Sequence, residues 1–294
     1  MIDRGMIDAF ASELIARLGE GRGLDLPIAP DARITADGYP AAIEDSLIGR
    51  ATGLGDVRIL ATDADSNQIG LFALVERGEQ ASVCGLRLRV ADGRAVEVET
   101  VAGPPRFPST GGVDAREAEP PRAAFARPPA TPGDREAMRH AASLYYAAVV
   151  REEPGIAPLD PAGARTEVGT RITDNPAFAF DFYAAIDGGE LPNFGEWSAR
   201  DQFLRGLWNA DGVTDERYPV VDRARGIVLA CTSYRPWHKR FETDVAGVGR
   251  VGPRVTGRRV ALNMMEMFRI EAGTILEMES VWTIEPAEFA SPWA

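Results

Sequence analysis

The chain has 294 residues, 45% of them hydrophobic, and a formal net charge of −12, a size that suits two domains. The negative charge argues against a nucleic-acid partner, because phosphate contacts need a basic surface. The chain lacks the run of about eighteen apolar residues that spans a membrane, and its N-terminal MIDRGMIDAF does not resemble a signal peptide. We therefore expect a cytoplasmic protein without a membrane partner.

Cysteine and histidine usage gives no support for metal or cofactor chemistry. Cys84 and Cys231 both fall within predicted strands and are expected to be buried free thiols. His140 and His238 are far apart and lack the spacing of a ligand pair, so no metal and no cofactor is expected. No Gly-x-Ser-x-Gly motif is present either, which leaves a serine hydrolase unsupported.

The first half of the chain reads as one helix followed by antiparallel strands. Residues 7–18 carry apolar side chains at helical spacing, and Gly19 ends the helix. Strand-like runs then cover residues 57–61, 69–76, 81–90 and 95–101. This order predicts an α+β fold with helices packed on one face of a sheet.

The middle of the chain, residues 104–133, is dense in proline and glycine. Such a composition is typical of an extended linker, and we expect no helix and no chemistry there.

The second half repeats the pattern of the first. A helix begins after the N-cap Asp134, and a strand is expected over residues 227–234. Between them lies an aromatic-rich insertion, residues 174–200, without a counterpart in the first half. A glycine-rich stretch at 246–257 lacks the strand–loop–helix setting of a phosphate-binding loop and is interpreted as a hairpin connection.

An internal repeat links the two halves. Residues 88–101, LRVADGRAVEVETV, align without a gap on residues 268–281, FRIEAGTILEMESV. The spacing is too long for a solenoid and indicates a duplicated domain. We expect a first domain over residues 1–103, a linker over 104–133 and a second domain over 134–294.

The register of these hairpins determines which side chains share a face. A two-residue turn would place Leu86 opposite Glu99, whereas a three-residue loop with a glycine bulge pairs Leu86 with Val98 and Arg87 with Glu97. The second register separates apolar from polar residues and is preferred. In the second copy it places Glu266 alone among apolar side chains, at the position that Leu86 occupies in the first copy.

The helix–strand order and the two closing hairpins resemble tandem nuclear transport factor 2-like (SnoaL-like) domains. The second half, through RYPVVDRARGIVLA, also resembles an uncharacterised bacterial and fungal family. This resemblance implies two cone-shaped α+β barrels, each a curved antiparallel sheet with helices around an apolar pocket. It also implies cofactor-independent isomerases, cyclases, dehydratases, epoxide hydrolases and lyases, or pure binding and dimerisation modules. The fold alone does not choose among these.

Glu266 is the first candidate for catalysis. Burial among apolar groups disfavours the carboxylate anion and raises its pKa, which suits general acid–base catalysis near neutral pH. The alternative is a structural ion pair with an arginine. Tyr234 and His238 are the other catalytic candidates, and the expected ligand contacts are Trp208, Tyr218, Tyr183, Met264, Phe268, Met278, Trp282 and Lys239. Pro236 places His238 and Lys239 at a strand end, which fits a pocket mouth or a solvated loop equally well.

Together these observations favour a cofactor-independent lyase or isomerase that acts on a hydrophobic aromatic or polycyclic small molecule. Glu266 would move a proton, and His238 or Tyr234 would protonate a departing oxygen. The alternative is a non-catalytic binding or dimerisation module. The expected partner is a hydrophobic small molecule, with a homodimer as an open option.

Overall fold

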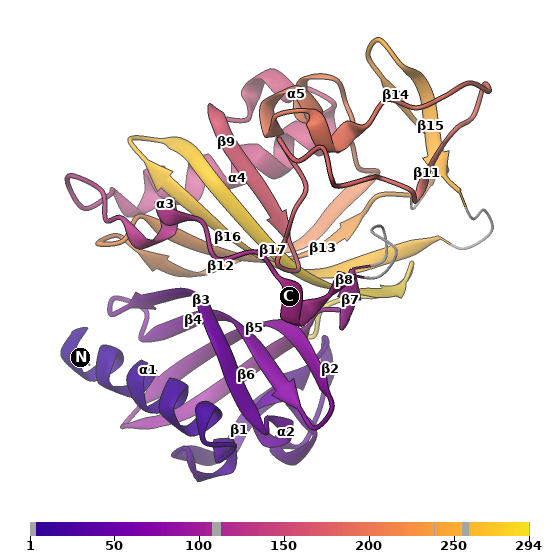
Figure 1. Cartoon of the computed structure of the whole chain (residues 1–294). Helices are drawn as coiled ribbons and strands as arrows, with labels where there is room; N and C mark the ends of the chain where they lie inside the picture. The colour runs from indigo at the N-terminus through magenta and orange to yellow at the C-terminus, as the bar shows by residue number, and fades with distance from the viewer. Residues whose placement is uncertain (1–3, 108–112, 238, 255–258, 294) are drawn as a thin grey trace.

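The computed structural model describes residues 4–107, 113–237, 239–254 and 259–293. Two curved six-stranded sheets lie one above the other, and helices cover the outer side of each (Figure 1). The α+β fold class expected from the sequence is confirmed. None of the described helices is long and apolar enough to cross a membrane.

The first sheet has the strand order β2-β1-β6-β5-β4-β3. Its pairs are antiparallel except β1 with β6, which run parallel. The strands are β1 (Ile28–Ala36), β2 (Tyr39–Pro40), β3 (Gly53–Asp63), β4 (Gln68–Arg77), β5 (Gln80–Ala91) and β6 (Arg94–Ala102).

The second sheet repeats this topology in the order β10-β9-β17-β16-β13-β12, again with one parallel pair, β9 with β17. Its strands are β9 (Leu159–Glu167), β10 (Thr170–Arg171), β12 (Gly212–Asp222), β13 (Ile227–Arg235), β16 (Val260–Glu271) and β17 (Thr274–Pro286). Two small sheets accompany it, made of β11 (Tyr183–Ala185), β14 (Thr243–Val245) and β15 (Gly249–Pro253), and of β7 (Arg106–Phe107) and β8 (Val113–Asp114).

Each sheet packs its long helix on the side away from the other sheet (Figure 1). The helices are α1 (Arg4–Gly19), α2 (Leu47–Arg50), α3 (Ala123–Ala126), α4 (Arg135–Arg151) and α5 (Ala199–Leu204). The buried face of α1 follows the 3.6-residue period, as predicted. The N-cap of α4 is also confirmed, because the Asp134 side chain accepts a hydrogen bond from the Ala137 N–H at 2.9 Å.

The predicted hairpin register is wrong by two residues. Leu86 lies opposite Thr100 and Leu88 opposite Val98, and the loop has two residues, Asp92 and Gly93, both with positive φ. The extra residue of the hairpin is not in the loop. It lies in β6, just after the turn, where the register shifts. A shift of two keeps every side chain on its face, since the strand period is two. The assignment of faces is therefore unaffected.

The two sheets touch through the faces that point away from the long helices. Gly85 leaves room for Met265, because a Cβ on this glycine would lie 2.9 Å from the Met265 Sδ. Arg58 of β3 forms a buried ion pair with Glu279 of β17, with Nη2 and Oε2 3.1 Å apart. Arg217 of β12 likewise reaches Glu99 of β6 at 2.7 Å. Buried charge pairs therefore cross the contact between the sheets.

Two connecting segments also join the halves. The predicted linker is not wholly extended: it contains α3, whose Phe125 is buried. The segment 287–293 after β17 lies on the first sheet, where the Trp293 indole N–H donates to Thr35 Oγ1 at 2.8 Å. The Trp293 ring lies 4.0 Å from the guanidinium of Arg33 and 4.5 Å from that of Arg87.

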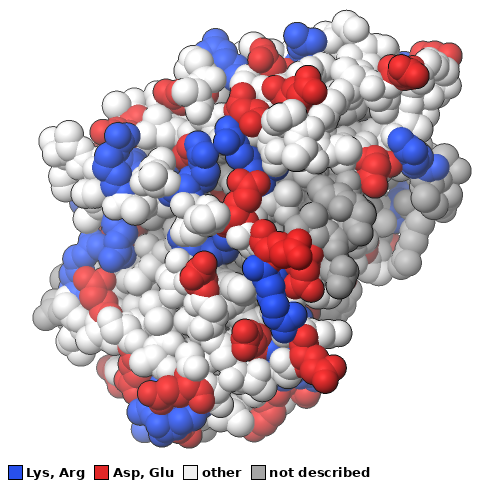
Figure 2. Space-filling view, in the orientation of Figure 1, with Lys and Arg blue, Asp and Glu red and all other residues white. Residues whose placement is uncertain are grey.

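Acidic and basic side chains alternate over the face of the molecule shown in Figure 2.

Candidate functional site

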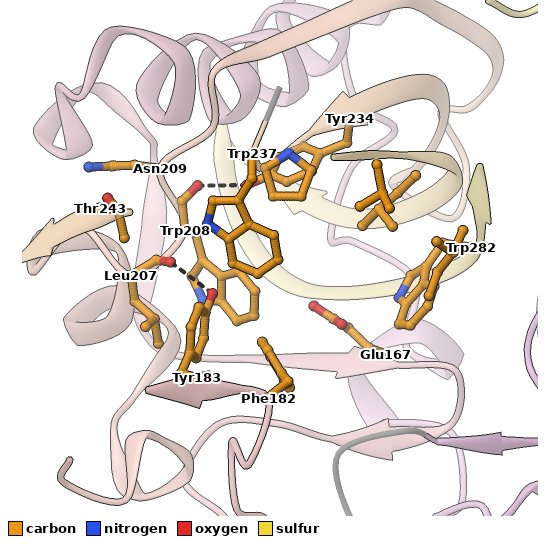
Figure 3. A pocket seen from close by; sticks show the side chains of 14 residues that line it. Glu167, Phe182, Tyr183, Leu207, Trp208, Asn209, Tyr234, Trp237, Thr243 and Trp282 are labelled. Carbon is orange, nitrogen blue, oxygen red and sulfur yellow. Dashed lines mark hydrogen bonds between the residues drawn. The ribbon is translucent and has the colours of Figure 1, made fainter. Parts of the chain in front are cut away.

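A cavity of ≈ 210 Å³ opens on the α4 side of the second sheet (Figure 3). The ends of β13, β16 and β17 form its floor, and the insertion between β10 and β12 covers it. In Figure 3 the Glu167 side chain extends between Trp282 on one side and Trp208 with Tyr183 on the other. The lining residues are Glu167, Phe182, Tyr183, Leu207, Trp208, Asn209, Tyr234, Pro236, Trp237, Thr243, Val260, Leu262, Trp282 and Ile284.

A smaller space of ≈ 40 Å³ continues this cavity toward α4. The two spaces share five lining residues, so they form one pocket with a wide aromatic part and a narrow inner end. Four further residues, Tyr145, Arg165, Met264 and Glu266, line only the inner end. The ionisable side chains are therefore concentrated where the pocket is narrowest.

Glu266 of β16 is 1% exposed. Its Oε2 accepts a hydrogen bond from the Tyr146 hydroxyl of α4 at 2.9 Å, and its Oε1 has no hydrogen-bond partner among the described residues. Burial raises the pKa of Glu266 to about 7, although Arg165 and the Tyr146 hydrogen bond oppose the shift. The carboxyl group is thus poised to gain or lose a proton near neutral pH.

Arg165 and Glu167 are neighbours on one face of β9. The Nη2 of Arg165 donates to Glu167 Oε1 at 3.0 Å, and both residues are buried. The Nε and Nη1 of Arg165 have no hydrogen-bond partner among the described residues. Burial raises the pKa of Glu167, and the Arg165 cation opposes that shift. The inner end therefore holds a neutral ion pair and one additional carboxyl group.

Trp208 separates the aromatic part from the inner end and is held on three sides. Its ring lies 4.0 Å from the Arg165 guanidinium. Its indole N–H donates to Gln202 Oε1 at 2.7 Å, and its carbonyl accepts from the Tyr234 hydroxyl at 2.7 Å. Gln202 is itself fully buried and donates to the backbone carbonyls of Ile172 and of Phe194, which lies in the insertion. The insertion thereby fixes the position of this pocket wall.

The first repeat is an apolar version of the same site. Sheet pairing places Leu86 at the position of Glu266, Ile34 at that of Arg165 and Ala36 at that of Glu167. The spacing of buried residues on α1 and α4 similarly aligns Leu14 with Tyr145 and Ile15 with Tyr146. The five polar groups at the inner end therefore have apolar counterparts in the first repeat. This polar set is not a requirement of the fold.

The structure brings six of the residues predicted from the sequence into this pocket: Glu266, Tyr234, Trp208, Tyr183, Met264 and Trp282. Phe268 and Met278 are buried in the core beside the pocket and are not in its lining. Tyr218 lies outside the lining and donates a hydrogen bond to Glu216. Lys239 is exposed, and its backbone N–H donates to Asp211 at 2.6 Å. His238 lies outside the described residues.

Four polar residues at or beside the inner end were missed by the sequence reasoning: Arg165, Glu167, Tyr145 and Tyr146. The period of two along β9 puts Arg165 and Glu167 on one face, and the repeat sets them against Ile34 and Ala36. The same comparison between the two repeats identified Glu266, because the first repeat has Leu86 at that position. For Arg165 and Glu167 it was missed because β9 pairs in parallel with a strand far along the chain, so no hairpin marks its register.

The described residues contain no group of three or more His, Cys, Asp or Glu side chains that could hold a metal ion. Cys84 and Cys231 are buried free thiols, and burial raises the pKa of each to about 12.

The fold and pocket define a class of α+β proteins in which a curved sheet encloses an apolar cavity. The chain belongs to the family described as "Domain of unknown function (DUF8021)", which matches residues 132–282, just over half of its length. The matched region contains the polar inner end of the pocket. No curated protein matches the chain.

Several solved structures are similar to parts of the chain. A steroid delta-isomerase from Pseudomonas aeruginosa is 23% identical, with 34% of this chain and 82% of that one covered and a TM-score of 0.28. An LEH-like epoxide hydrolase of M. tuberculosis is 10% identical, with coverages of 51% and 86% and a TM-score of 0.28. An NTF-2 like protein of unknown function from Burkholderia xenovorans is also 10% identical, with coverages of 55% and 93% and a TM-score of 0.29.

Proposed function

We propose that the protein is a cofactor-independent lyase or isomerase that acts on a hydrophobic aromatic or polycyclic small molecule. Residues 134–294 would carry the activity, and residues 1–103 would support that domain as a structural repeat. The observation that carries the proposal is the placement of Glu266, a buried carboxyl group outside any ion pair of the described residues, at the inner end of an apolar pocket.

Glu266 would act as the general acid–base. With a pKa of about 7 it is present in both protonation states near neutral pH, the condition under which one group can take a proton and return it. Its Oε1 would face the reacting atom, while the Tyr146 hydroxyl holds Oε2. In a lyase reaction Glu266 would take the proton of a substrate hydroxyl while the adjacent C–C bond breaks, and it would return that proton to the carbon that leaves. In an isomerase reaction it would move a proton between two carbons.

The part first assigned to Tyr234 needs revision. Its hydroxyl proton is donated to the Trp208 carbonyl at 2.7 Å, so Tyr234 holds the pocket wall and has no proton left for a departing oxygen. Tyr234 thus becomes a positioning residue in the proposed mechanism. The aromatic walls, Trp208, Tyr183 and Trp282, would bind the apolar body of the substrate.

The experiment is a turnover screen with hydroxylated and carbonyl-bearing aromatic compounds, with products detected by mass spectrometry. Glu266→Gln keeps the shape of the side chain but cannot transfer a proton, and it should lower turnover by roughly 10²–10⁴-fold. Ser280→Ala is the matched control, because Ser280 lies directly opposite Glu266 on the same face. Equal turnover by the wild type and Glu266→Gln would contradict the proposal.

The second candidate is a non-catalytic binding module in which Glu266 has only a structural role. It predicts ligand binding without conversion of any compound. The Oε1 of Glu266 has no hydrogen-bond partner among the described residues, which argues against this reading because a purely structural carboxylate is expected to have both oxygens satisfied.

A further inference from the structure

We infer that the inner end of the pocket is a subsite for one neutral oxygen atom of the ligand, a ketone carbonyl or a hydroxyl, and that it discriminates against carboxylates and amines. The inference rests on the proposed function, because it specifies the class of molecule that Glu266 would act on. Three buried atoms at this end, Arg165 Nε and Nη1 and Glu266 Oε1, have no hydrogen-bond partner among the described residues.

Arg165 supplies the donors. Its side chain is 4% exposed and lines the ≈ 40 Å³ space, yet its Nε and Nη1 have no hydrogen-bond partner among the described residues. A guanidinium group only donates hydrogen bonds. Buried donors without an acceptor are costly and rare in native proteins. The vacant partner of Arg165 is therefore an acceptor, which oxygen atoms provide.

Glu266 supplies the second unsatisfied group, Oε1. A ketone oxygen would accept from Arg165 and also from Glu266 in its protonated form. A hydroxyl oxygen would accept from Arg165 and donate its own hydrogen to Glu266 in its ionised form. A single neutral oxygen thus satisfies both groups, whichever form Glu266 takes.

The charges at this end exclude the other ligand classes. Arg165 and Glu167 form a pair of zero net charge, with 3.0 Å between their closest atoms. A ligand carboxylate would add an uncompensated negative charge beside two buried carboxyl groups. A ligand ammonium offers no acceptor to Arg165, and while Glu266 is protonated, below about pH 7, its positive charge would be uncompensated. Both arrangements cost more free energy than a neutral oxygen.

The shape of the pocket sets the orientation of the ligand. The inner end, at ≈ 40 Å³, has room for a functional group, whereas the aromatic part has ≈ 210 Å³. The apolar body of the ligand would stay between Trp208 and Trp282 while its oxygen enters the inner end.

The experiment compares naphthalene derivatives that differ only in this functional group. The ligands are 2-acetylnaphthalene, 1-(2-naphthyl)ethanol, 2-ethylnaphthalene, 2-naphthoate and 1-(2-naphthyl)ethylamine, titrated calorimetrically at pH 6, 7 and 8. A hydrogen bond to a charged group predicts binding of the ketone and the alcohol about ten- to a hundredfold tighter than that of the hydrocarbon. At pH 6, where Glu266 is protonated, the carboxylate and the amine should bind at least about tenfold more weakly than the ketone.

The ketone and the alcohol should also differ in pH dependence. Ketone binding needs protonated Glu266 and should weaken by up to about tenfold per pH unit above about 7, while alcohol binding should not weaken. In Glu266→Gln the amide can still donate to the ketone, so ketone binding should become independent of pH.

Variants test the role of Arg165. Arg165→Met alone leaves Glu167 buried and unpaired, so it can fail to fold. Arg165→Ile combined with Glu167→Ala instead installs the residues that the first repeat has at Ile34 and Ala36. This double variant should fold and bind the ketone no more tightly than the hydrocarbon. Circular dichroism and thermal unfolding report its folding.

The outcomes separate this inference from the proposed function. Binding of 2-naphthoate as tight as that of the ketone, an undiminished ketone preference in the folded double variant, or no binding of any naphthalene ligand would overturn the inference. Glu266-dependent turnover would still support the proposed enzyme. Conversely, an Arg165-dependent preference without Glu266-dependent turnover would support the subsite and contradict the enzyme.

Discussion

Replacing Glu266 by leucine tests the physical premise of the site without knowledge of a substrate. Leucine is the residue of the first repeat at this position, Leu86. The substitution removes the hydrogen-bond partner of Tyr146, so Tyr146→Phe accompanies it and avoids a buried hydroxyl without a partner. Glu266→Gln, which keeps the hydrogen bond and removes only the ionisation, is the control.

The expected effect is a change in how stability depends on pH. The folded-state pKa of Glu266 is about 7 and the reference value is 4.5. A raised carboxyl pKa gives stability that is fully present below pH 4.5 and is lost as the pH rises through 7. Between pH 5 and pH 8 this group should cost the wild type about 2.5 kcal/mol of unfolding free energy relative to either variant.

The assay is urea unfolding of the three proteins at pH 5, 6, 7 and 8. The buried Glu167 and Glu279 also have raised pKa values, so every protein should lose stability over this range. Only the difference between the wild type and the variants isolates Glu266. Parallel stability curves would mean that Glu266 is ionised throughout this range and would refute the reasoning.

Three further outcomes follow from the contacts described. Leu86→Glu should lower the free energy of unfolding by several kcal/mol, and by more at pH 8 than at pH 5, because the first repeat has apolar residues where Glu266 has polar neighbours. Equal destabilisation at both pH values in urea unfolding would contradict this. Arg58→Met should lower the free energy of unfolding by about 3–5 kcal/mol, because it leaves Glu279 buried and unpaired. Adding Glu279→Met should restore most of that loss, which a double-mutant cycle would measure. Tyr146→Phe should raise the pKa of Glu266 by removing a hydrogen bond that favours its anion, which carboxyl NMR titration would detect as a higher midpoint than in the wild type.

The sequence predicted the structure best where buried side chains recur at a regular spacing and where the two halves of the chain can be aligned. The long helices and the faces of the closing hairpins could be predicted because buried positions recur every 3.6 or every two residues. The hairpin register could not, because both turn types fit the same alternation and differ only in where the extra residue sits. Since both registers keep Glu266 on the α4 side, the main candidate survived the error.

The rest of the site depended on contacts between distant parts of the chain. Arg165 lies on a strand that meets its neighbour in parallel, so no local turn fixes its register. Tyr146 reaches Glu266 from α4 across 120 positions of sequence. Tyr234 and Trp237 both line the pocket although alternation along a strand would put them on opposite faces, because β13 ends at Arg235, before Pro236.

The segment 287–293 connects the pocket to the first repeat, whose described residues contribute no side chain to the pocket lining. β17 carries Trp282 and Ile284 in the pocket wall. The chain then continues to Trp293, whose ring lies within 4.5 Å of the guanidinium groups of Arg33 and Arg87. The outer end of β17 is therefore held by its pairing with β16 and, through Trp293, by contacts with the first sheet. A substitution at Thr35, which accepts the hydrogen bond of the Trp293 indole, should therefore alter the position of the β17 residues in the pocket wall. The first sheet thus contributes to the position of the pocket wall although it has apolar residues in place of the polar groups of the inner end.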